Sequence, residues 1–160
     1  MERIGLIGLG RMGQAIAARL LDNGNSVIVS NRTPARAEAL LARGATWADT
    51  PADLVRAADI ILTILTDDHA VEAVYCGPHG LLAHAAEGRL LVEMSTIRTA
   101  TILGLAAPAA AVGAHLIDMP VSGTVAPARA GQLLGMAGGR AEDLARRSHT
   151  HFPSTKNGVS

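Results

Sequence analysis

The sequence predicts an α/β protein with a doubly wound, mainly parallel sheet and helices on both of its faces. Short β-rich runs alternate with stretches rich in alanine and leucine through most of the 160 residues, and this alternation is typical of a parallel sheet covered by helices. The composition agrees, because 30 alanines and 17 glycines stand beside only 2% aromatic residues. Such small side chains suit close packing of helices on a sheet and disfavour a β-sandwich, which depends on aromatic and β-branched residues.

The first half of the chain alternates between strands and helices at short intervals. Strands are expected at residues 3–7, 26–30 and 59–65. Helices are expected at residues 11–23 and 33–43, in a short stretch that begins at Thr50–Pro51, and from Asp67–Asp68 to residue 74. Thr33 and Thr50 each precede a proline, and a threonine N-cap followed by proline at the first helical position is a common helix start.

The second half continues the pattern and then loses it. Strands are expected at residues 89–93, 115–119 and 133–137, and helices at 99–112, 126–130 and 141–147. Residues 148–160 have no apolar periodicity and consist largely of serine, threonine, histidine, proline and glycine. We therefore expect one domain at 1–147 and an irregular tail at 148–160.

Charge and cysteine content exclude several classes of protein. Lys+Arg and Asp+Glu balance at 14 each, with a pI near 7.0, so a basic surface for nucleic acid is not expected. The single cysteine, Cys76, rules out an internal disulfide and a cysteine-rich zinc site. None of the histidines pairs with another at helical spacing beside a carboxylate, so we expect no metal site.

The chain shows no sign of a membrane or export segment. No apolar run reaches the roughly 18 residues that a transmembrane helix needs. The first residues lead directly into a short apolar strand rather than into the apolar region of a signal peptide. We expect a soluble, cytoplasmic protein without a membrane partner.

A glycine-rich turn connects the first expected strand to the first expected helix. It consists of Gly8, Leu9, Gly10, Arg11, Met12 and Gly13. In a strand–turn–helix context this G-x-G-x-x-G spacing is typical of dinucleotide binding and of a Rossmann-type fold. The first glycine permits the tight turn, the second lets the backbone approach a pyrophosphate, and the third allows close helix packing, with the helix N-terminus facing the phosphates. A tight turn without a ligand is the alternative.

The end of the second strand indicates which dinucleotide is preferred. An NAD site commonly places a carboxylate there to bind the ribose 2′-hydroxyl, whereas this chain has Ser30 followed by Asn31, Arg32 and Thr33. The Arg32 guanidinium suits a 2′-phosphate, and Asn31 and Thr33 offer neutral hydrogen bonds. We therefore expect NADP as the cofactor, with NAD possible; Arg32 as a merely solvated residue is the alternative.

Three motifs in order resemble the β-hydroxyacid dehydrogenase family, which includes 3-hydroxyisobutyrate dehydrogenase, tartronate semialdehyde reductase and the cofactor domain of 6-phosphogluconate dehydrogenase. The first is the glycine-rich turn at Leu6–Gly13. The second is Glu93–Ile97, which is similar to the family's S-T turn near the nicotinamide ribose. The third is Asp118–Gly123, which is similar to its D-A-P-V-S-G substrate loop, and Met136–Gly139 follows it. The resemblance covers roughly residues 1–147.

The resemblance implies hydride transfer between NAD(P) and a small 3-hydroxy acid or its semialdehyde or ketone. By position it implies that Leu65, Thr66 and Thr96 contact the cofactor, and that Ser122, Gly123 and Thr124 bind the substrate. Asp67 and Asp68 are interpreted as helix caps. The family forms homodimers through a helical second domain. This chain lacks that domain, so its assembly is left open.

The sequence departs from the family at its catalytic lysine. The family carries that general acid/base in a K-x-x-N arrangement on a long helix, whereas the only lysine here is Lys156, in the irregular tail and followed at once by Asn157. We therefore assign no catalytic residue, and the chain resembles a C-terminally truncated member that lacks the family's helical second domain. By itself it is expected to be inactive.

Two other functions remain open. A non-catalytic dinucleotide-binding module would keep the fold without the chemistry. An imine-reductase-like enzyme is suggested by Asn31–Thr33 and opposed by Pro120–Gly123.

Overall fold

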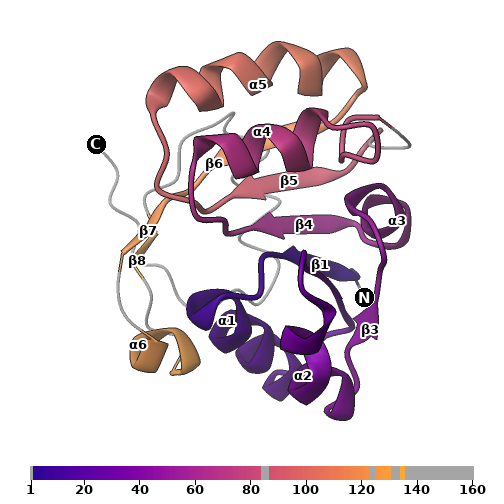
Figure 1. Cartoon of the computed structure of the whole chain (residues 1–160), viewed down its shortest axis with the longest axis vertical. Coiled ribbons are helices and arrows are strands. Elements are labelled where there is room, and N and C mark those ends of the chain that lie inside the picture. The colour runs from indigo at the N-terminus through magenta and orange to yellow at the C-terminus, as the bar shows by residue number, and fades with distance from the viewer. Residues whose placement is uncertain (1, 84–86, 123–124, 131–133, 136–160) are drawn as a thin grey trace.

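A six-stranded parallel sheet forms the centre of the computed structural model, which describes residues 2–83, 87–122, 125–130 and 134–135 (Figure 1). Its strand order is β3-β2-β1-β4-β5-β6, which is the order of a Rossmann-type sheet. The strands are β1 (Ile4–Ile7), β2 (Val27–Ser30), β3 (Thr46–Trp47), β4 (Ile60–Thr63), β5 (Leu90–Glu93) and β6 (His115–Asp118). The predicted fold class is confirmed.

Helices cover both faces of this sheet. They are α1 (Arg11–Asp22), α2 (Glu38–Ala42), α3 (Pro51–Ala57), α4 (Asp68–Cys76), α5 (Thr99–Ala111) and α6 (Val125–Arg129), with a 3-10 turn η1 (Pro34–Ala37) before α2. Helices α1, α2 and α6 contribute to the buried cluster on one face, and α3, α4 and α5 contribute to the cluster on the other. Because both faces are buried, the four-residue strands β1, β2, β4 and β5 contain no exposed residue.

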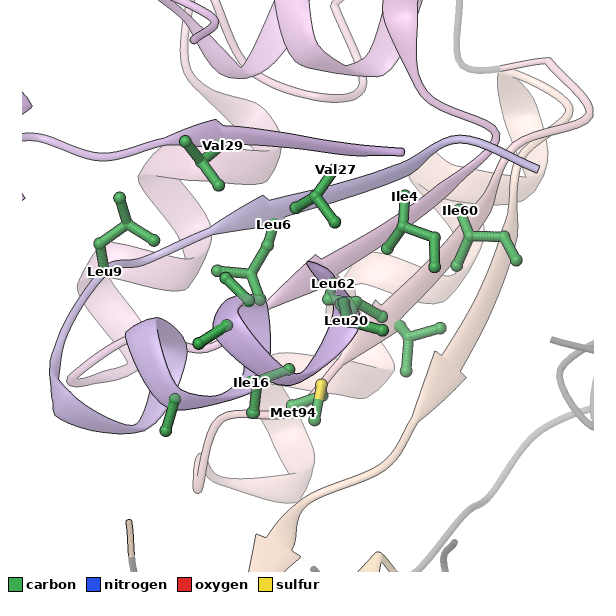
Figure 2. Packing of buried hydrophobic residues seen from close by; sticks show 14 of the residues in the cluster. Ile4, Leu6, Leu9, Ile16, Leu20, Val27, Val29, Ile60, Leu62 and Met94 are labelled. Atoms are coloured by element: carbon green, nitrogen blue, oxygen red, sulfur yellow. The ribbon is translucent and has the colours of Figure 1, made fainter. Parts of the chain in front are cut away.

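The core under α1 consists of aliphatic side chains in close contact. Ile16 and Leu20 of α1 belong to one buried cluster with Leu6 of β1 and Leu62 of β4 (Figure 2), and all four side chains are at most 1% exposed. Burying a leucine or isoleucine side chain contributes about 1.5–3 kcal/mol. This face therefore fixes α1, and with it the turn that leads into the helix.

The strand register places one row of residues along the carboxyl edge of the sheet. Ile7 of β1 is paired with Ser30 of β2 and with Thr63 of β4. Thr63 is paired with Glu93 of β5, and Glu93 with Asp118 of β6. Every segment that the sequence analysis assigned to cofactor or substrate follows a member of this row.

The main sheet and its helices differ from the expected elements chiefly after β2 and after β4. The expected helix at 33–43 is a 3-10 turn followed by α2, and the Thr33 side chain makes no capping bond. Residue Thr33 is instead extended, as residues before proline usually are. Strand β3 was not expected, because two residues are too few to show an alternation. Strand β4 ends at Thr63, so Leu65 and Thr66 lie in the loop after it.

A second, two-stranded sheet follows the main one. Strands β7 (Val121–Ser122) and β8 (Leu134–Gly135) pair antiparallel, and β7 was not expected. The expected helix at 141–147 and the tail at 148–160 lie outside the described residues. None of the helices in the described part of the chain is long and apolar enough to span a membrane.

Candidate functional site

The three glycines of the turn after β1 meet different constraints. Gly8 has φ +101°, a left-handed conformation that favours glycine, and a Cβ there would collide with the Ile64 carbonyl oxygen. A Cβ at Gly13 would collide with the carbonyl oxygen of Gly8. A Cβ at Gly10 would meet nothing within 4 Å. The protein itself therefore requires glycine at two positions, and only Gly10 borders open space.

Helix α1 begins directly at this open space. Its N-cap is Gly10, with φ −67° and ψ −175°, and no side chain caps the helix. No acidic residue lies in its first turn. The N–H groups at the start of an α-helix have no partner within the helix, and they carry the positive end of its dipole. The turn thus presents unneutralised donors to a ligand, which is how helix N-termini bind phosphate.

Asn31 connects this turn to the segment after β2. Its side-chain Oδ1 accepts a hydrogen bond from the Leu9 N–H at 2.9 Å, and its Nδ2 donates to the Thr33 carbonyl at 3.0 Å. A further backbone bond joins the Gly8 N–H to the Ser30 carbonyl at 3.2 Å. Asn31 was expected to contact the cofactor, and the structure shows that its side chain also holds the two loops together.

Two arginines beside the turn have exposed side chains. Arg11 is the first residue of α1 and Arg32 follows Asn31, and both are exposed. Neither guanidinium forms an ion pair or a hydrogen bond within the described part of the chain. No carboxylate lies in the segment Ser30–Thr33. Positive charge is therefore available where a dinucleotide would place its phosphates.

The loops after β4 and β5 are held together at two levels. Nearer the sheet, the Ser95 hydroxyl accepts a hydrogen bond from the Leu65 N–H at 2.8 Å. Farther along, the Asp68 carboxylate accepts from the Arg98 N–H at 3.0 Å and from the Thr101 hydroxyl. These bonds, that of Thr101 above all, lower the pKa of Asp68.

Asp67 and Asp68 differ in what they bind. Asp67 caps α4 by accepting from the Ala70 N–H at 2.8 Å, as the sequence analysis expected. Asp68 instead connects the start of α4 to the start of α5. The exposed residues Thr66 and Thr96 are carried by the two connected loops.

A buried polar network lies beneath these two loops. The Glu93 carboxyl group accepts from the Ser95 N–H at 2.8 Å and contacts the Thr63 hydroxyl, which lies 3.1 Å from the Tyr75 hydroxyl. Burial raises the pKa of Glu93, and burial together with the nearby Glu93 charge raises the pKa of Tyr75. The sequence analysis included Glu93 in the second family motif but gave it no role. Its partners Thr63 and Tyr75 are distant in sequence, so their contact could not be predicted.

The substrate residues are described only in part. Asp118 ends β6, and burial raises the pKa of its half-buried carboxyl group. Ser122 lies in β7, whereas Gly123, Thr124 and Lys156 lie outside the described residues. No group of three or more histidine, cysteine or acidic residues in the described part of the chain could hold a metal ion.

Comparison with known proteins shows the family of this chain. Residues 3–150 match the model of a family described as the NAD binding domain of 6-phosphogluconate dehydrogenase. The chain belongs to this family. Its NAD-binding domain is therefore that of the hydroxyacid-dehydrogenase-like oxidoreductases, and the resemblance seen in the sequence is confirmed.

Proteins similar to this NAD-binding domain include a dehydrogenase, an NADP+ complex and an imine reductase. A 3-hydroxyisobutyrate dehydrogenase from Pseudomonas aeruginosa is 41% identical over 146 residues, which cover 91% of this chain and 49% of that protein. A solved structure of Psf3 in complex with NADP+ and 2-OPP is 40% identical, with a TM-score of 0.88 and coverage of 96% and 56%. An imine reductase from Streptomyces aurantiacus is 30% identical, with a TM-score of 0.85 and coverage of 98% and 54%. The chain spans about half the length of these relatives.

Proposed function

We propose that this chain is the NADP(H)-binding part of an oxidoreductase that transfers hydride between the nicotinamide and a small 3-hydroxy acid or its semialdehyde or ketone. The observation that carries the proposal is the open space at Gly10, which borders an uncapped helix start. The exposed Arg11 and Arg32 lie on the adjoining segments and have no ion-pair partner among the described residues. The fold does not require glycine at position 10, because a Cβ there would meet nothing within 4 Å. The absence of a Cβ does allow a phosphate to approach the backbone. The relatives with dehydrogenase names support the reaction class.

Three parts of the cofactor have a matching group in the chain. The N–H groups at the start of α1 would bind the pyrophosphate, and Arg32 would bind the 2′-phosphate through charge-assisted hydrogen bonds. Thr66 and Thr96, on the loops after β4 and β5, would flank the nicotinamide ribose. When bound, the cofactor supplies or accepts the hydride.

The substrate would lie beyond the ends of β5 and β6. The family resemblance assigns the substrate to Ser122 and Gly123, where backbone N–H groups next to small side chains would bind an anionic group. Asp118 ends the neighbouring strand. We assign the proton transfer to no residue of the described part of the chain, and Lys156 is not proposed for it. We further propose a cytoplasmic location and a homodimeric assembly of the whole protein.

A second candidate is an imine reductase. It is favoured by the structural similarity to the Streptomyces aurantiacus enzyme and by Asn31–Thr33. The higher identity to a 3-hydroxyisobutyrate dehydrogenase, 41% against 30%, favours the hydroxy acid.

Cofactor titration tests the proposal. We expect the purified chain to bind NADPH more tightly than NADH, as measured by nicotinamide fluorescence or calorimetry. Replacing Arg32 by alanine or aspartate should weaken NADPH binding about 10–100-fold, because hydrogen bonds to charged groups are worth about 1.5–3 kcal/mol. NADH binding should change little.

The matched control is Arg56→Ala, which removes an exposed arginine near the amino ends of the strands. This control should leave both affinities unchanged. Equal affinities for the two cofactors, or a preference for NADPH that survives Arg32→Asp, would contradict the assignment.

A further inference from the structure

Glu93 is a carboxyl group buried inside the sheet. Its exposure is 0%, and it lies on β5 between β4 and β6. No arginine forms an ion pair with it among the described residues. A carboxyl group without a cation is costly to bury, and an apolar side chain of similar size would cost less. The fold alone therefore gives no reason for an acid at this position.

Its contacts show what the carboxyl group does. Ser95 lies just past the end of β5 and is 2% exposed. The Ser95 N–H donates to Glu93 Oε1 at 2.8 Å, so Glu93 satisfies a buried donor that would otherwise cost free energy. The same serine accepts the Leu65 N–H through its hydroxyl. Glu93 thus fixes the residue that joins the loop after β5 to the loop after β4.

The other carboxyl oxygen anchors this arrangement to the core. Glu93 Oε2 contacts the Thr63 hydroxyl, which lies 3.1 Å from the hydroxyl of Tyr75 on α4. Thr63 and Tyr75 are both 0% exposed. The network therefore runs from α4 through β4 and β5 to the loops that carry the exposed residues Thr66 and Thr96.

We propose that Glu93 is a positioning residue that determines cofactor affinity without touching the cofactor, by holding the Ser95–Thr96 turn against the Leu65–Thr66 loop. The inference rests on the proposed function, because these two loops are its nicotinamide-side loops. The network needs one acceptor for the Ser95 N–H and one partner for the Thr63 hydroxyl. A glutamine supplies both, since its Oε1 accepts and its Nε2 donates, whereas an alanine supplies neither.

Three variants and a control test the proposal by NADPH titration. Glu93→Ala should weaken NADPH binding at least tenfold, and Glu93→Gln should bind within about threefold of the wild type. Ser95→Ala removes the acceptor of the Leu65 N–H and the serine hydroxyl's own bond to Glu93. It keeps the Ser95 N–H that donates to Glu93, so it should weaken binding by a smaller factor. Leu90→Ala, a fully buried change at the other end of the same strand, is the control for general destabilisation and should keep the wild-type affinity.

Amide hydrogen exchange of the cofactor-free chain gives a second readout. Glu93→Ala should speed exchange at Ser95 and Leu65, and Glu93→Gln should restore the wild-type rates. If Glu93→Ala does not fold, Ser95→Ala and Glu93→Gln carry the test. Wild-type affinity in Glu93→Ala or Ser95→Ala, a loss in Glu93→Gln equal to that of alanine, or an equal loss in Leu90→Ala would each overturn the proposal.

Failure of the two proposals can be told apart. A wild-type chain that binds neither NADPH nor NADH would overturn the proposed function. Amide exchange at Ser95 and Leu65 would then still decide whether Glu93 holds the two loops, and unchanged rates in Glu93→Ala would overturn that.

Discussion

The two edges of the parallel sheet differ in whether the arginines beside β1 have a carboxylate partner. At the amino edge, Asp59 lies between two arginines that precede neighbouring strands, with an Arg3 ion pair at 3.0 Å and an Arg89 ion pair at 3.2 Å. At the carboxyl edge, Arg11 and Arg32 are exposed and have no carboxylate partner in the described part of the chain.

This difference separates stabilising charges from binding charges. Arg3 and Arg89 already have their anion in Asp59, so an external anion gains little from them. At the carboxyl edge Arg98 is paired with Asp68, whereas Arg11 and Arg32 stand beside the uncapped start of α1, whose dipole has the same sign. In a doubly wound sheet, ligands bind outside the carboxyl ends of the strands, and the exposed Arg11 and Arg32 lie at that edge here.

The largest effect is expected from Gly13→Ala. The added methyl group would collide with the backbone oxygen of Gly8, which cannot move without breaking the turn. Overpacking of this kind costs about 1–3 kcal/mol and occasionally more, so we expect a clear fall in the free energy of unfolding, measured by chemical denaturation. A variant as stable as the wild type would show that the turn does not need close helix packing.

Gly10→Ala should affect binding instead of stability. Its backbone angles suit alanine and its Cβ would meet nothing within 4 Å, so stability should be unchanged or rise by up to about 1 kcal/mol. The methyl group would occupy the space proposed for the pyrophosphate, and we expect NADPH affinity to fall about 10–100-fold, as an overpacking cost of about 1–3 kcal/mol implies. Unchanged affinity with unchanged stability would mean that no ligand approaches this backbone.

The smallest effect is expected at the amino edge, from Asp59→Asn. The hydrogen bond from Arg3 lowers the pKa of Asp59, so the ionised form stabilises the fold at neutral pH. That stabilisation disappears as the pH falls through the lowered pKa. Partly exposed pairs are worth about 0.2–1 kcal/mol each, so the substitution should cost about 1 kcal/mol at pH 7 and nothing in strong acid.

Denaturation of the wild type and the variant across this pH range measures the difference. NADPH affinity should stay at the wild-type value, because the substitution lies at the opposite edge from the proposed site. A loss of affinity in Asp59→Asn would remove the distinction between the two edges.

The sequence predicted the local features of this molecule well. Strand β1, helix α1 and strand β5 begin and end within one residue of their expected bounds, because a glycine or a charged residue lies at or next to each end. The packing and turn roles of Gly8 and Gly13 also followed from their spacing alone. Strand β3 was missed, since its two residues are defined by pairing with β2 and carry no pattern of their own.

Contacts between distant segments could not be predicted from the sequence. The Asn31 amide was assigned to the cofactor, and nothing in its neighbours indicated that Leu9, 22 residues away, would be its partner. Glu93 likewise reaches Thr63 across 30 residues of sequence. Such pairs exist only once the strands are in register, and a single sequence does not state the register.

The amide of Asn31 has one more consequence. Because Oδ1 holds the Leu9 N–H and Nδ2 holds the Thr33 carbonyl, the phosphate turn and the segment that carries Arg32 behave as one mechanical unit. If the cofactor binds as proposed, ordering one segment would order the other, and we expect recognition of the 2′-phosphate and of the pyrophosphate to be thermodynamically coupled. The losses of NADPH binding free energy in the Arg32 and Gly10 variants should then not be additive. Replacing Asn31 to break the amide bridge should make them additive.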